Sequence, residues 1–286
     1  MSYRLQSLSL FRTNSRAELR SVSCNIRNQF RFLTFFGVKM TAAIEQVNDN
    51  LILIGGESGA GKSACLMNLR NHEGVLYLNC EAGKKLPFRN KFQSVTITDP
   101  LQVYEGFTWA ESQPDIHTIV IDSVSFLMEM FESVHIVGAA DTRAKWQDYS
   151  QFFKNLMQQY VAKSSKNVIM ITHIAEDVDE ATGLRKTQAR VKGALKNTGI
   201  EAYFSLNVNA KKVPIRDLEQ YQNQYLNITE DDKLVGYKHV FQTRITKNTT
   251  GERIRGPMGM FKPTETFIDN DAQILLDVVH EFYKED

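Results

Sequence analysis

The sequence predicts an α/β fold in which a mostly parallel central sheet carries helices on both faces. Short apolar runs alternate along the chain with longer polar or amphipathic stretches, the pattern of buried parallel strands and their covering helices. The first run leads directly into a glycine-rich loop. Beyond about residue 200 the alternation is lost, so we expect antiparallel strands added at a sheet edge near the C-terminus.

The first part of the fold follows from the apolar runs. Leu51–Ile54 is such a run and ends in glycines, as a buried parallel strand does. The other strands expected in the parallel sheet cover residues 75–80, 94–97, 118–121 and 167–172. The helices expected between the strands cover residues 62–71, 101–112 and 144–163.

The later part of the chain has a different pattern. Strands are expected at 203–209 and 238–246, joined by a long polar loop, and an acidic amphipathic helix at 271–284. We therefore divide the chain into a core at 40–270 and a C-terminal helix at 271–286.

The first 39 residues are set apart from this core by their charge. They hold seven basic residues and a single acid, Glu18, and they resemble an organelle transit peptide. A disordered basic tail, or a true start at Met40, explains the same composition, and we favour these two because a compact domain begins after Met40. The expected location is then the cytoplasm, with organelle targeting as the alternative.

The composition of the chain argues against several classes of protein. Removing 1–39 from the totals of 34 basic and 33 acidic residues leaves 27 and 32, so the body has a charge of about −5, unlike a globally basic nucleic-acid binder. No run reaches the roughly 18 apolar residues of a membrane helix, so no membrane partner is expected. Three cysteines without metal-ligand spacing fit a reduced protein.

The glycine-rich loop carries the strongest functional signal. Its pattern, Gly-x-x-x-x-Gly-Lys-Ser between a strand and a helix, is that of a phosphate-binding loop, in which backbone N–H groups and the helix N-terminus face phosphate oxygens. The residues expected to bind ATP are Gly56, Glu57, Ser58, Gly59, Ala60, Gly61, Lys62, Ser63 and Ala64. Lys62 is expected to reach the β- and γ-phosphates, and the Ser63 hydroxyl to ligate Mg²⁺.

A carboxylate after the strand at 118–121 completes the expected magnesium site. Asp122 follows Thr118-Ile119-Val120-Ile121, and ligands in parallel sheets bind beyond the carboxyl ends of the strands. Asp122 is therefore expected to hold Mg²⁺ through water, together with Ser63. Capping of a helix that starts after Ser123 is the other interpretation.

Two further polar residues stand at the same edge of the sheet. Glu81 follows the strand at 75–80, where a carboxylate can accept a proton from the attacking water. His173 ends the strand at 167–172 and is expected to hydrogen-bond the γ-phosphate or its water. The other interpretation is that Glu81 is an ordinary exposed glutamate at a strand end and that His173 has only a structural role.

The segment after His173 is rich in basic residues. Between residues 181 and 196 there are five bases and no acid, so we expect a mobile loop that contacts nucleic-acid phosphates. A solvated surface loop has the same composition. The expected DNA-binding residues are Arg185, Lys186, Arg190, Lys192 and Lys196.

These motifs together resemble a known family. The strand 119–124 looks like the Walker B strand of RecA-type recombinases, and the loop, Glu81 and Thr172-His173 occur in the RecA order. Residues about 48–265 more closely resemble the phage RecA-like ATPases of the Sak single-strand-annealing group, which are minimal recombinase cores. The resemblance implies a RecA-like P-loop NTPase fold and a DNA-dependent ATPase in recombination, annealing or repair.

The resemblance also implies roles for single residues. It places Glu81 at the catalytic base and His173 at the γ-phosphate sensor, where RecA itself has a glutamine. The segment 176–196 corresponds to the second DNA-binding loop and 132–144 to the first, with Arg143 and Lys145 as phosphate contacts. Lys247 corresponds to a trans-acting lysine that completes a neighbouring subunit's ATP site, a role that Arg253 or Arg255 could share.

The expected partners follow from these roles. They are single-stranded DNA, further copies of this chain with ATP at the subunit interface, and a single-strand-binding protein. A RecA-like C-terminal domain and a clear polymerisation strand before the core are missing from the pattern, so annealing or short rings are expected. The alternatives are a replicative helicase or loader, a P-loop small-molecule kinase, and a non-hydrolysing nucleotide-dependent assembly factor.

Overall fold

The computed structural model describes residues 47–178, 180–181 and 183–284, all within one compact unit, Ile44–Asp286. The expected basic extension at 1–39 lies outside the described residues, as do 40–46 of the expected core and the last two residues.

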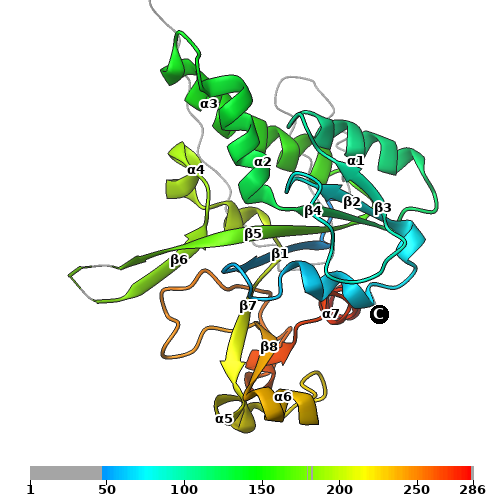
Figure 1. Ribbon diagram of the computed structural model, residues 1–286, viewed down its shortest axis with the longest axis vertical. Helices are drawn as coiled ribbons and strands as arrows, with labels where there is room; N and C mark the ends of the chain where they lie inside the picture. Colours follow the sequence, from blue (N-terminus) through cyan, green and yellow to red (C-terminus); the bar gives the residue numbers. More distant parts are fainter. Residues whose placement is uncertain (1–46, 179, 182, 285–286) are drawn as a thin grey trace, which may run out of the picture. The chain divides into compact units, whose positions relative to one another are not determined.

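A nine-stranded sheet organises the described residues (Figure 1). Its strands are β1 (Leu51–Gly56), β2 (Val75–Asn79), β3 (Gln93–Thr96), β4 (Thr118–Asp122), β5 (Asn167–Val178), β6 (Arg185–Ala189), β7 (Leu206–Pro214), β8 (Tyr237–Gln242) and β9 (Phe267–Asp269). They lie in the order β3-β2-β4-β5-β1-β7-β8-β9, and β6 pairs with β5 outside this path. The strands from β3 to β7 in this order are parallel, and β8, β9 and β6 join in antiparallel pairs. The predicted fold class is confirmed.

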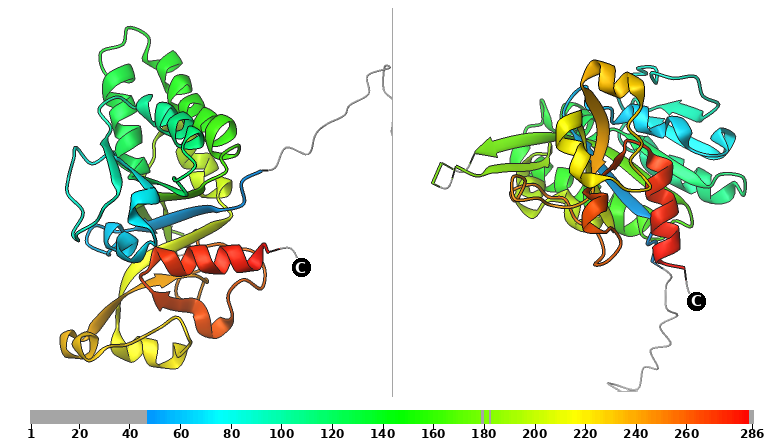
Figure 2. Two further views of the ribbon diagram at one scale, coloured as in Figure 1. Left: turned by 90° about the vertical axis from the view of Figure 1, so that its right-hand side faces the viewer. Right: turned by 90° about the horizontal axis from the view of Figure 1, so that it is seen from below.

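Helices cover both faces of the sheet. The α-helices are α1 (Gln102–Ser112), α2 (Val124–Phe131), α3 (Thr142–Asn155), α4 (Gly193–Thr198), α5 (Ile215–Leu218), α6 (Glu230–Val235) and α7 (Ala272–Phe282). Short 3₁₀ helices are η1 (Ser63–Asn68), η2 (His72–Gly74), η5 (Ile200–Tyr203), η6 (Glu219–Tyr221) and η7 (Pro263–Thr266), and π-helical turns are η3 (Glu132–Ile136) and η4 (Leu156–Val161). Figure 2 shows α7 on the opposite side of the sheet from α1, α2 and α3.

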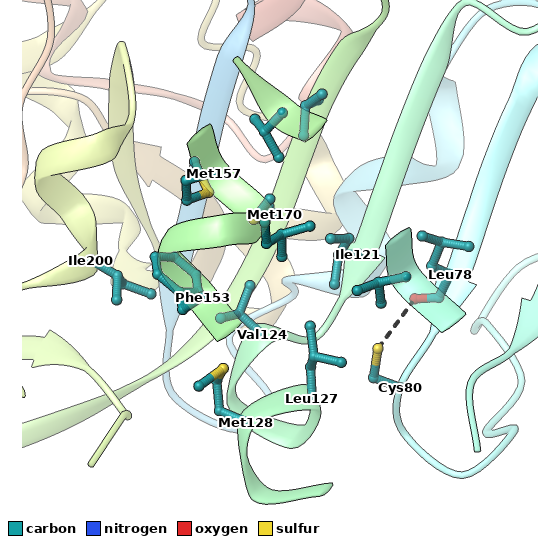
Figure 3. Packing of buried hydrophobic residues seen from close by; sticks show 14 of the residues in the cluster. Leu78, Cys80, Ile121, Val124, Leu127, Met128, Phe153, Met157, Met170 and Ile200 are labelled. Atoms are coloured by element: carbon teal, nitrogen blue, oxygen red, sulfur yellow. Dashed lines mark hydrogen bonds between the residues drawn. The ribbon is translucent and has the colours of Figure 1, made fainter. Parts of the chain in front are cut away.

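The two faces of the sheet build two hydrophobic clusters. Leu51 and Leu53 of β1 pack under α1, α2 and α3, whereas Ile52 and Ile54 pack with η1 and α7. Side chains on a strand alternate between faces, so burial of both faces requires a continuous apolar run. The first cluster includes Val124 and Leu127 of α2 beside Phe153 of α3 (Figure 3). Both layers thus hold the carboxyl ends of the parallel strands in fixed positions.

The structure corrects two expected helices and adds a third. The helix expected at 62–71 is the 3₁₀ helix η1 over Ser63–Asn68, which has the same buried apolar residues in a tighter turn. The helix expected at 144–163 is α3 followed by the π-helical turn η4. A helix also starts directly after Asp122-Ser123, α2, which the sequence analysis considers only as the alternative interpretation of Asp122.

The structure also corrects the predicted mobile loop after His173. The strand expected to end at 172 continues to Val178, and β6 returns antiparallel to it with Ile174 opposite Ala189 and Val178 opposite Arg185. The basic segment therefore supplies the return strand of a β-hairpin, β6, followed by α4, and the hairpin extends beyond the neighbouring strands (Figure 1). Likewise the first expected DNA loop, 132–144, contains the π-helical turn η3 and the start of α3.

The C-terminal strands differ in extent from the expected ones. The strand expected at 203–209 is β7 over Leu206–Pro214, and that expected at 238–246 is β8 over Tyr237–Gln242. Lys247 therefore lies in a turn after the strand, not on it, and its backbone is held by local hydrogen bonds between Thr246 and Thr249. Among the described helices, none is long and apolar enough to span a membrane.

Candidate nucleotide-binding site

The glycine-rich loop begins where β1 ends at Gly56 and continues into η1. Gly59 and Gly61 have φ angles of 75° and 95°, a region that residues with a Cβ rarely adopt. The glycines of the motif therefore allow the backbone curl that aims N–H groups at one point.

Residues from the C-terminal part of the chain fasten this loop. His239 of β8 donates from Nδ1 to the Ala60 carbonyl at 2.9 Å, and Asn270 Nδ2 donates to the Gly61 carbonyl at 2.9 Å. A Cβ on Gly61 would lie 2.7 Å from Asn270 Nδ2, so the close approach itself requires glycine. The sequence analysis missed both residues.

Lys62 lies inside the curl of the loop. Its ammonium group donates to the Glu57 carbonyl at 2.7 Å, and only 7% of the residue is exposed. Burial lowers the pKa of Lys62, and the nearby carboxylates of Asp122 and Glu81 oppose this shift. A buried ammonium between carboxylates is placed to meet the negative charge of a phosphate chain.

Asp122 ends β4 beside the loop, as predicted. Its Oδ2 accepts hydrogen bonds from Ser63 Oγ at 2.7 Å and from the Tyr77 hydroxyl at 2.9 Å. The other oxygen, Oδ1, is buried and has no hydrogen-bond partner among the described residues. Burial raises the pKa of Asp122, and the bonds from Ser63 and Tyr77 oppose the rise.

These groups fit a Mg²⁺ ion that is shared with a nucleotide. The described residues contain no cluster of three or more His, Cys, Asp or Glu side chains that could hold a metal by themselves. Mg²⁺ in nucleotide sites commonly takes one or two protein oxygens and completes its shell with water and phosphate. The Ser63 hydroxyl and the unpaired Oδ1 of Asp122 are such oxygens, so the residues present fit the ion.

Glu81, in the turn after β2, and His173 of β5 meet across the site. Their side chains approach at 3.4 Å between Glu81 Oε1 and His173 Nε2, and Lys84 Nζ lies 3.0 Å from Glu81 Oε2. Burial by itself would raise the pKa of Glu81, but the hydrogen bonds from Lys84 and His173 outweigh it and hold the pKa below its usual value. Burial and the charge of Lys62 lower the pKa of His173. Glu81 is therefore ionised at neutral pH, and His173 is held toward its neutral form.

The order of the strands explains why these residues converge. β5 lies between β1 and β4, with His173 opposite Gly56 and Ile171 opposite Asp122. Together they line a cavity of about 320 Å³, within the range of small-ligand sites. Its lining comprises Ser58, Gly59, Gly61, Lys62, Ser63, Ala64, Tyr77, Glu81, Lys84, Lys85, Leu86, Pro87, Asp122, His173 and His239.

The residues expected to contact DNA lie outside this cavity. Arg185 and Lys186 lie in β6, and Arg185 is 3.9 Å from Glu176 on the paired strand. Arg190 and Lys192 follow β6 and form ion pairs with α2 and η3, to Glu129 at 2.5 Å and to Glu132 at 2.7 Å. These two bases join the end of the hairpin to the helix that follows Asp122.

The remaining residues expected to contact DNA or a neighbouring subunit lie on separate parts of the fold. Lys196 lies in α4. Arg143 and Lys145 lie in the first turn of α3, where Lys145 pairs with Asp148 at 3.0 Å. Arg253 pairs with Glu201 at 3.0 Å, and Lys247 is exposed. None of them lines the nucleotide cavity within the part of the chain that the structure describes.

Comparison with known proteins agrees with this site. A protein-family model described as an AAA domain matches residues 48–212, which is more than half of the chain. The match spans the glycine-rich loop, Glu81, Asp122, His173 and the hairpin. Among curated proteins, none matches the chain.

Proposed function

Since the chain belongs to the AAA-domain family of nucleotide-binding ATPases, we propose that it hydrolyses ATP under the control of single-stranded DNA. The biological role proposed is recombination, annealing or repair of the kind carried out by phage RecA-like proteins. Support for this finer role comes from the way in which one strand joins the nucleotide cavity to the hairpin that carries the expected DNA-binding residues Arg185 and Lys186.

The proposed reaction starts with the triphosphate in the loop. Backbone N–H groups and Lys62 bind its phosphates, and Ser63 and Asp122 would hold Mg²⁺, which neutralises charge that develops on the phosphate oxygens. Glu81 orients a water molecule and takes its proton as the water oxygen forms a bond to the γ-phosphorus. The bond from that phosphorus to the β–γ bridging oxygen breaks, and its electron pair leaves with ADP.

The ionisation states at the site suit this chemistry. A base must be deprotonated to accept the proton, and the lowered pKa of Glu81 keeps it ionised at neutral pH. The neutral form of His173 can donate one hydrogen bond and accept another, and it lies 3.4 Å from Glu81. His173 therefore contacts the same region that the terminal phosphate is proposed to occupy.

One observation carries the proposed coupling to DNA. His173 is a residue of β5, and five residues later the same strand ends at Val178, opposite Arg185 of the hairpin. The returning chain is fastened to it, because Arg190 N donates to the His173 carbonyl at 2.8 Å. A displacement of His173 by the terminal phosphate would therefore move the hairpin as well.

The chemistry of the hairpin suits a phosphate backbone better than bases. Arg185 and Lys186 on β6 supply positive charge, with Asp177 of β5 opposite Lys186 and Glu176 of β5 3.9 Å from Arg185. The segment 176–196 contains no Phe, Tyr or Trp that would stack on a base. Binding to single strands would therefore be sensitive to salt and have little sequence preference.

The decisive experiment is ATP hydrolysis by the full chain with and without single-stranded DNA. We expect stimulation by DNA that is lost in Lys62→Ala and Glu81→Gln. The double variant Arg185→Ala/Lys186→Ala should keep basal hydrolysis and lose the stimulation by DNA. It should also lower the slope of log DNA affinity against log salt concentration by about two. The matched control is Lys91→Ala/Lys233→Ala, two exposed lysines on other elements.

The outcomes separate the proposed role from its alternatives. Hydrolysis that is indifferent to DNA would contradict the coupling. Phosphoryl transfer to a nucleoside would instead identify a small-molecule kinase, and binding of ATP without turnover would identify an assembly factor. Unwinding of a forked duplex would point to a helicase.

We also propose that ATP binds between copies of the chain, with Lys247 of a neighbouring copy reaching the terminal phosphate. The exposed position of Lys247 outside its own cavity is compatible with this role. Mixing Lys62→Ala with Lys247→Ala tests it, because a Lys62→Ala subunit would supply an intact Lys247 to the ATP site of a neighbouring Lys247→Ala subunit. Restored hydrolysis in the mixture is expected, and a mixture no more active than its components would contradict the trans-acting role. A single-strand-binding protein is a further proposed partner.

A further inference from the structure

The turn that follows β2 is built so that Lys84 folds back toward Glu81. Asn79 is buried, and its side chain accepts from Glu81 N at 2.9 Å and donates to the Lys84 carbonyl at 2.9 Å. Lys84 N also donates to the Glu81 carbonyl at 3.0 Å. Ala82 and Gly83 between them both have positive φ, which reverses the chain. The two charged side chains are thus set side by side by the backbone.

Glu81 has both of its carboxylate oxygens engaged in this arrangement. Lys84 Nζ lies 3.0 Å from Oε2, and His173 Nε2 lies 3.4 Å from Oε1. A carboxylate that accepts hydrogen bonds in this way is held ionised, but it is a weaker proton acceptor than a free one. A base in this state requires one of its oxygens to be released before it can bind the attacking water.

Lys84 is the partner that can leave. Its side chain is 71% exposed, whereas that of Glu81 is 12% exposed, and a surface ion pair three residues apart in sequence holds weakly. Lys84 also lines the same cavity as Lys62 and Ser63. Burial is the main cause of the lowered pKa of Lys62, and the charge of Lys84 acts in the same direction, so the two ammonium groups repel each other. Two cations facing one cavity favour a multiply charged anion between them.

We infer that Lys84 is a second phosphate-binding cation, which exchanges the Glu81 carboxylate for the terminal phosphate when ATP binds. This inference rests on the proposed hydrolysis through Glu81. Lys84 stays protonated throughout and transfers no proton. Its departure from Oε2 leaves that oxygen to orient the water. Because the γ-phosphate is the group that takes Lys84 in this exchange, activation of the base is coupled to the presence of a triphosphate.

The test compares the affinities of the full chain for ATP and ADP, measured by competition with a fluorescent nucleotide. Lys84→Met should weaken ATP binding roughly tenfold or more, the range for a hydrogen bond between charged groups, and leave ADP binding within about twofold. Lys84→Arg, which keeps the charge, should retain most of the preference for ATP. The matched control is Lys91→Met, because Lys91 is 76% exposed, lies on the same connection, and pairs with Glu73 at 3.0 Å.

The affinity ratio decides the inference independently of turnover. A loss of ATP affinity that is confined to Lys84→Met supports it even if the wild-type chain does not hydrolyse ATP, a result that would contradict only the proposed function. An unchanged ratio of ATP to ADP affinity in Lys84→Met overturns the inference, even if hydrolysis is normal. Equal losses for both nucleotides also overturn it, because they indicate a purely structural role for the turn.

Discussion

The hydroxyl of Tyr77 offers a specific test of the magnesium site. Tyr77 is buried on β2 and donates to Asp122 Oδ2 at 2.9 Å, while Oδ1 of the same carboxylate has no hydrogen-bond partner in the part of the chain that the structure describes. The hydroxyl therefore fixes which oxygen is left for the ion. Tyr77→Phe removes this hydrogen bond and keeps the ring, whose centroid lies 6.2 Å from the centroid of the Phe92 ring.

The expected magnitude follows from the geometry. A hydrogen bond to a charged group contributes about 1.5–3 kcal/mol. Asp122 Oδ2 keeps its bond from Ser63 at 2.7 Å in the variant, so we take the lower end of that range. At 1.4 kcal/mol for each factor of ten, the Mg²⁺-dependent part of nucleotide affinity should fall roughly tenfold. Nucleotide affinity in EDTA should remain unchanged.

The loss of Mg²⁺-dependent nucleotide affinity in Tyr77→Phe should also depend on pH. Mg²⁺ binds the ionised form of Asp122, whose pKa burial already raises and the Tyr77 bond lowers. Tyr77→Phe removes the lowering contact, so the pKa of Asp122 rises further. The protonated fraction then increases as the pH falls, and the deficit in Mg²⁺ binding should be larger near pH 6 than near pH 8.5.

The assay is a Mg²⁺ titration of fluorescent-nucleotide binding across this pH range. Tyr104→Phe is the control, because the Tyr104 hydroxyl donates to the Phe152 carbonyl at 2.8 Å away from the cavity. The reasoning is refuted if Tyr77→Phe and Tyr104→Phe bind Mg²⁺-nucleotide equally well. If the deficit in Mg²⁺ binding of Tyr77→Phe does not change with pH, Tyr77 orients the Asp122 carboxylate but does not act through the pKa of Asp122.

Two further predictions concern the loop and the core. Gly61→Ala places a Cβ 2.7 Å from Asn270 Nδ2 at a φ of 95°, so nucleotide affinity by direct titration should fall more than tenfold; Gly236→Ala, with positive φ and open space, should leave it unchanged. Phe153→Ala removes a fully buried ring and should lower the free energy of unfolding by about 3–5 kcal/mol in a denaturant titration, whereas exposed Val137→Ala should change it by less than about 0.5 kcal/mol. Near-equal values for either pair would contradict the packing described.

The parallel sheet could be predicted because burial on both faces leaves a continuous apolar signal. Leu53 and Ile54 are adjacent in sequence and belong to opposite clusters, and the run at 51–54 shows both at once. The hairpin could not be predicted in the same way. Asp177 and Val178 are exposed, so neither face is marked by apolar residues, and the pairing depends on the backbone ladder.

Some residues of the candidate site could be predicted from the sequence, and others could not. The glycine-rich loop is contiguous, and its residue types are dictated by the backbone curl, so the sequence reveals it. Tyr77 lies within an apolar strand and looks like a core residue. His239 and Asn270 lie far along the chain from the loop that they fasten. Their role depends on which strands are neighbours, and a single sequence does not show this. Lys84 and Glu81 are only three residues apart, but their pairing depends on the turn that Asn79 holds.

The place of β5 in the sheet gives the proposed coupling a mechanical basis. β5 pairs with β1 on one side and with β4 on the other, so it lies between the phosphate-binding loop and Asp122. Its backbone is also tied to α2, because Ser125 Oγ accepts from His173 N at 3.1 Å. Val178 lies five residues beyond His173, which at about 3.3 Å per residue is roughly 17 Å along the strand.

A tilt of β5 by about 5° at His173 would therefore move the hairpin near Val178 by roughly 1.5 Å, since the displacement grows with distance along a strand of this rise. Arg190 and Lys192 would resist that tilt through their ion pairs with Glu129 and Glu132. A phosphate backbone that drew these two bases away would release the hairpin from α2 and η3. Nucleotide and DNA would then act on the two ends of one strand, and each would alter the affinity for the other.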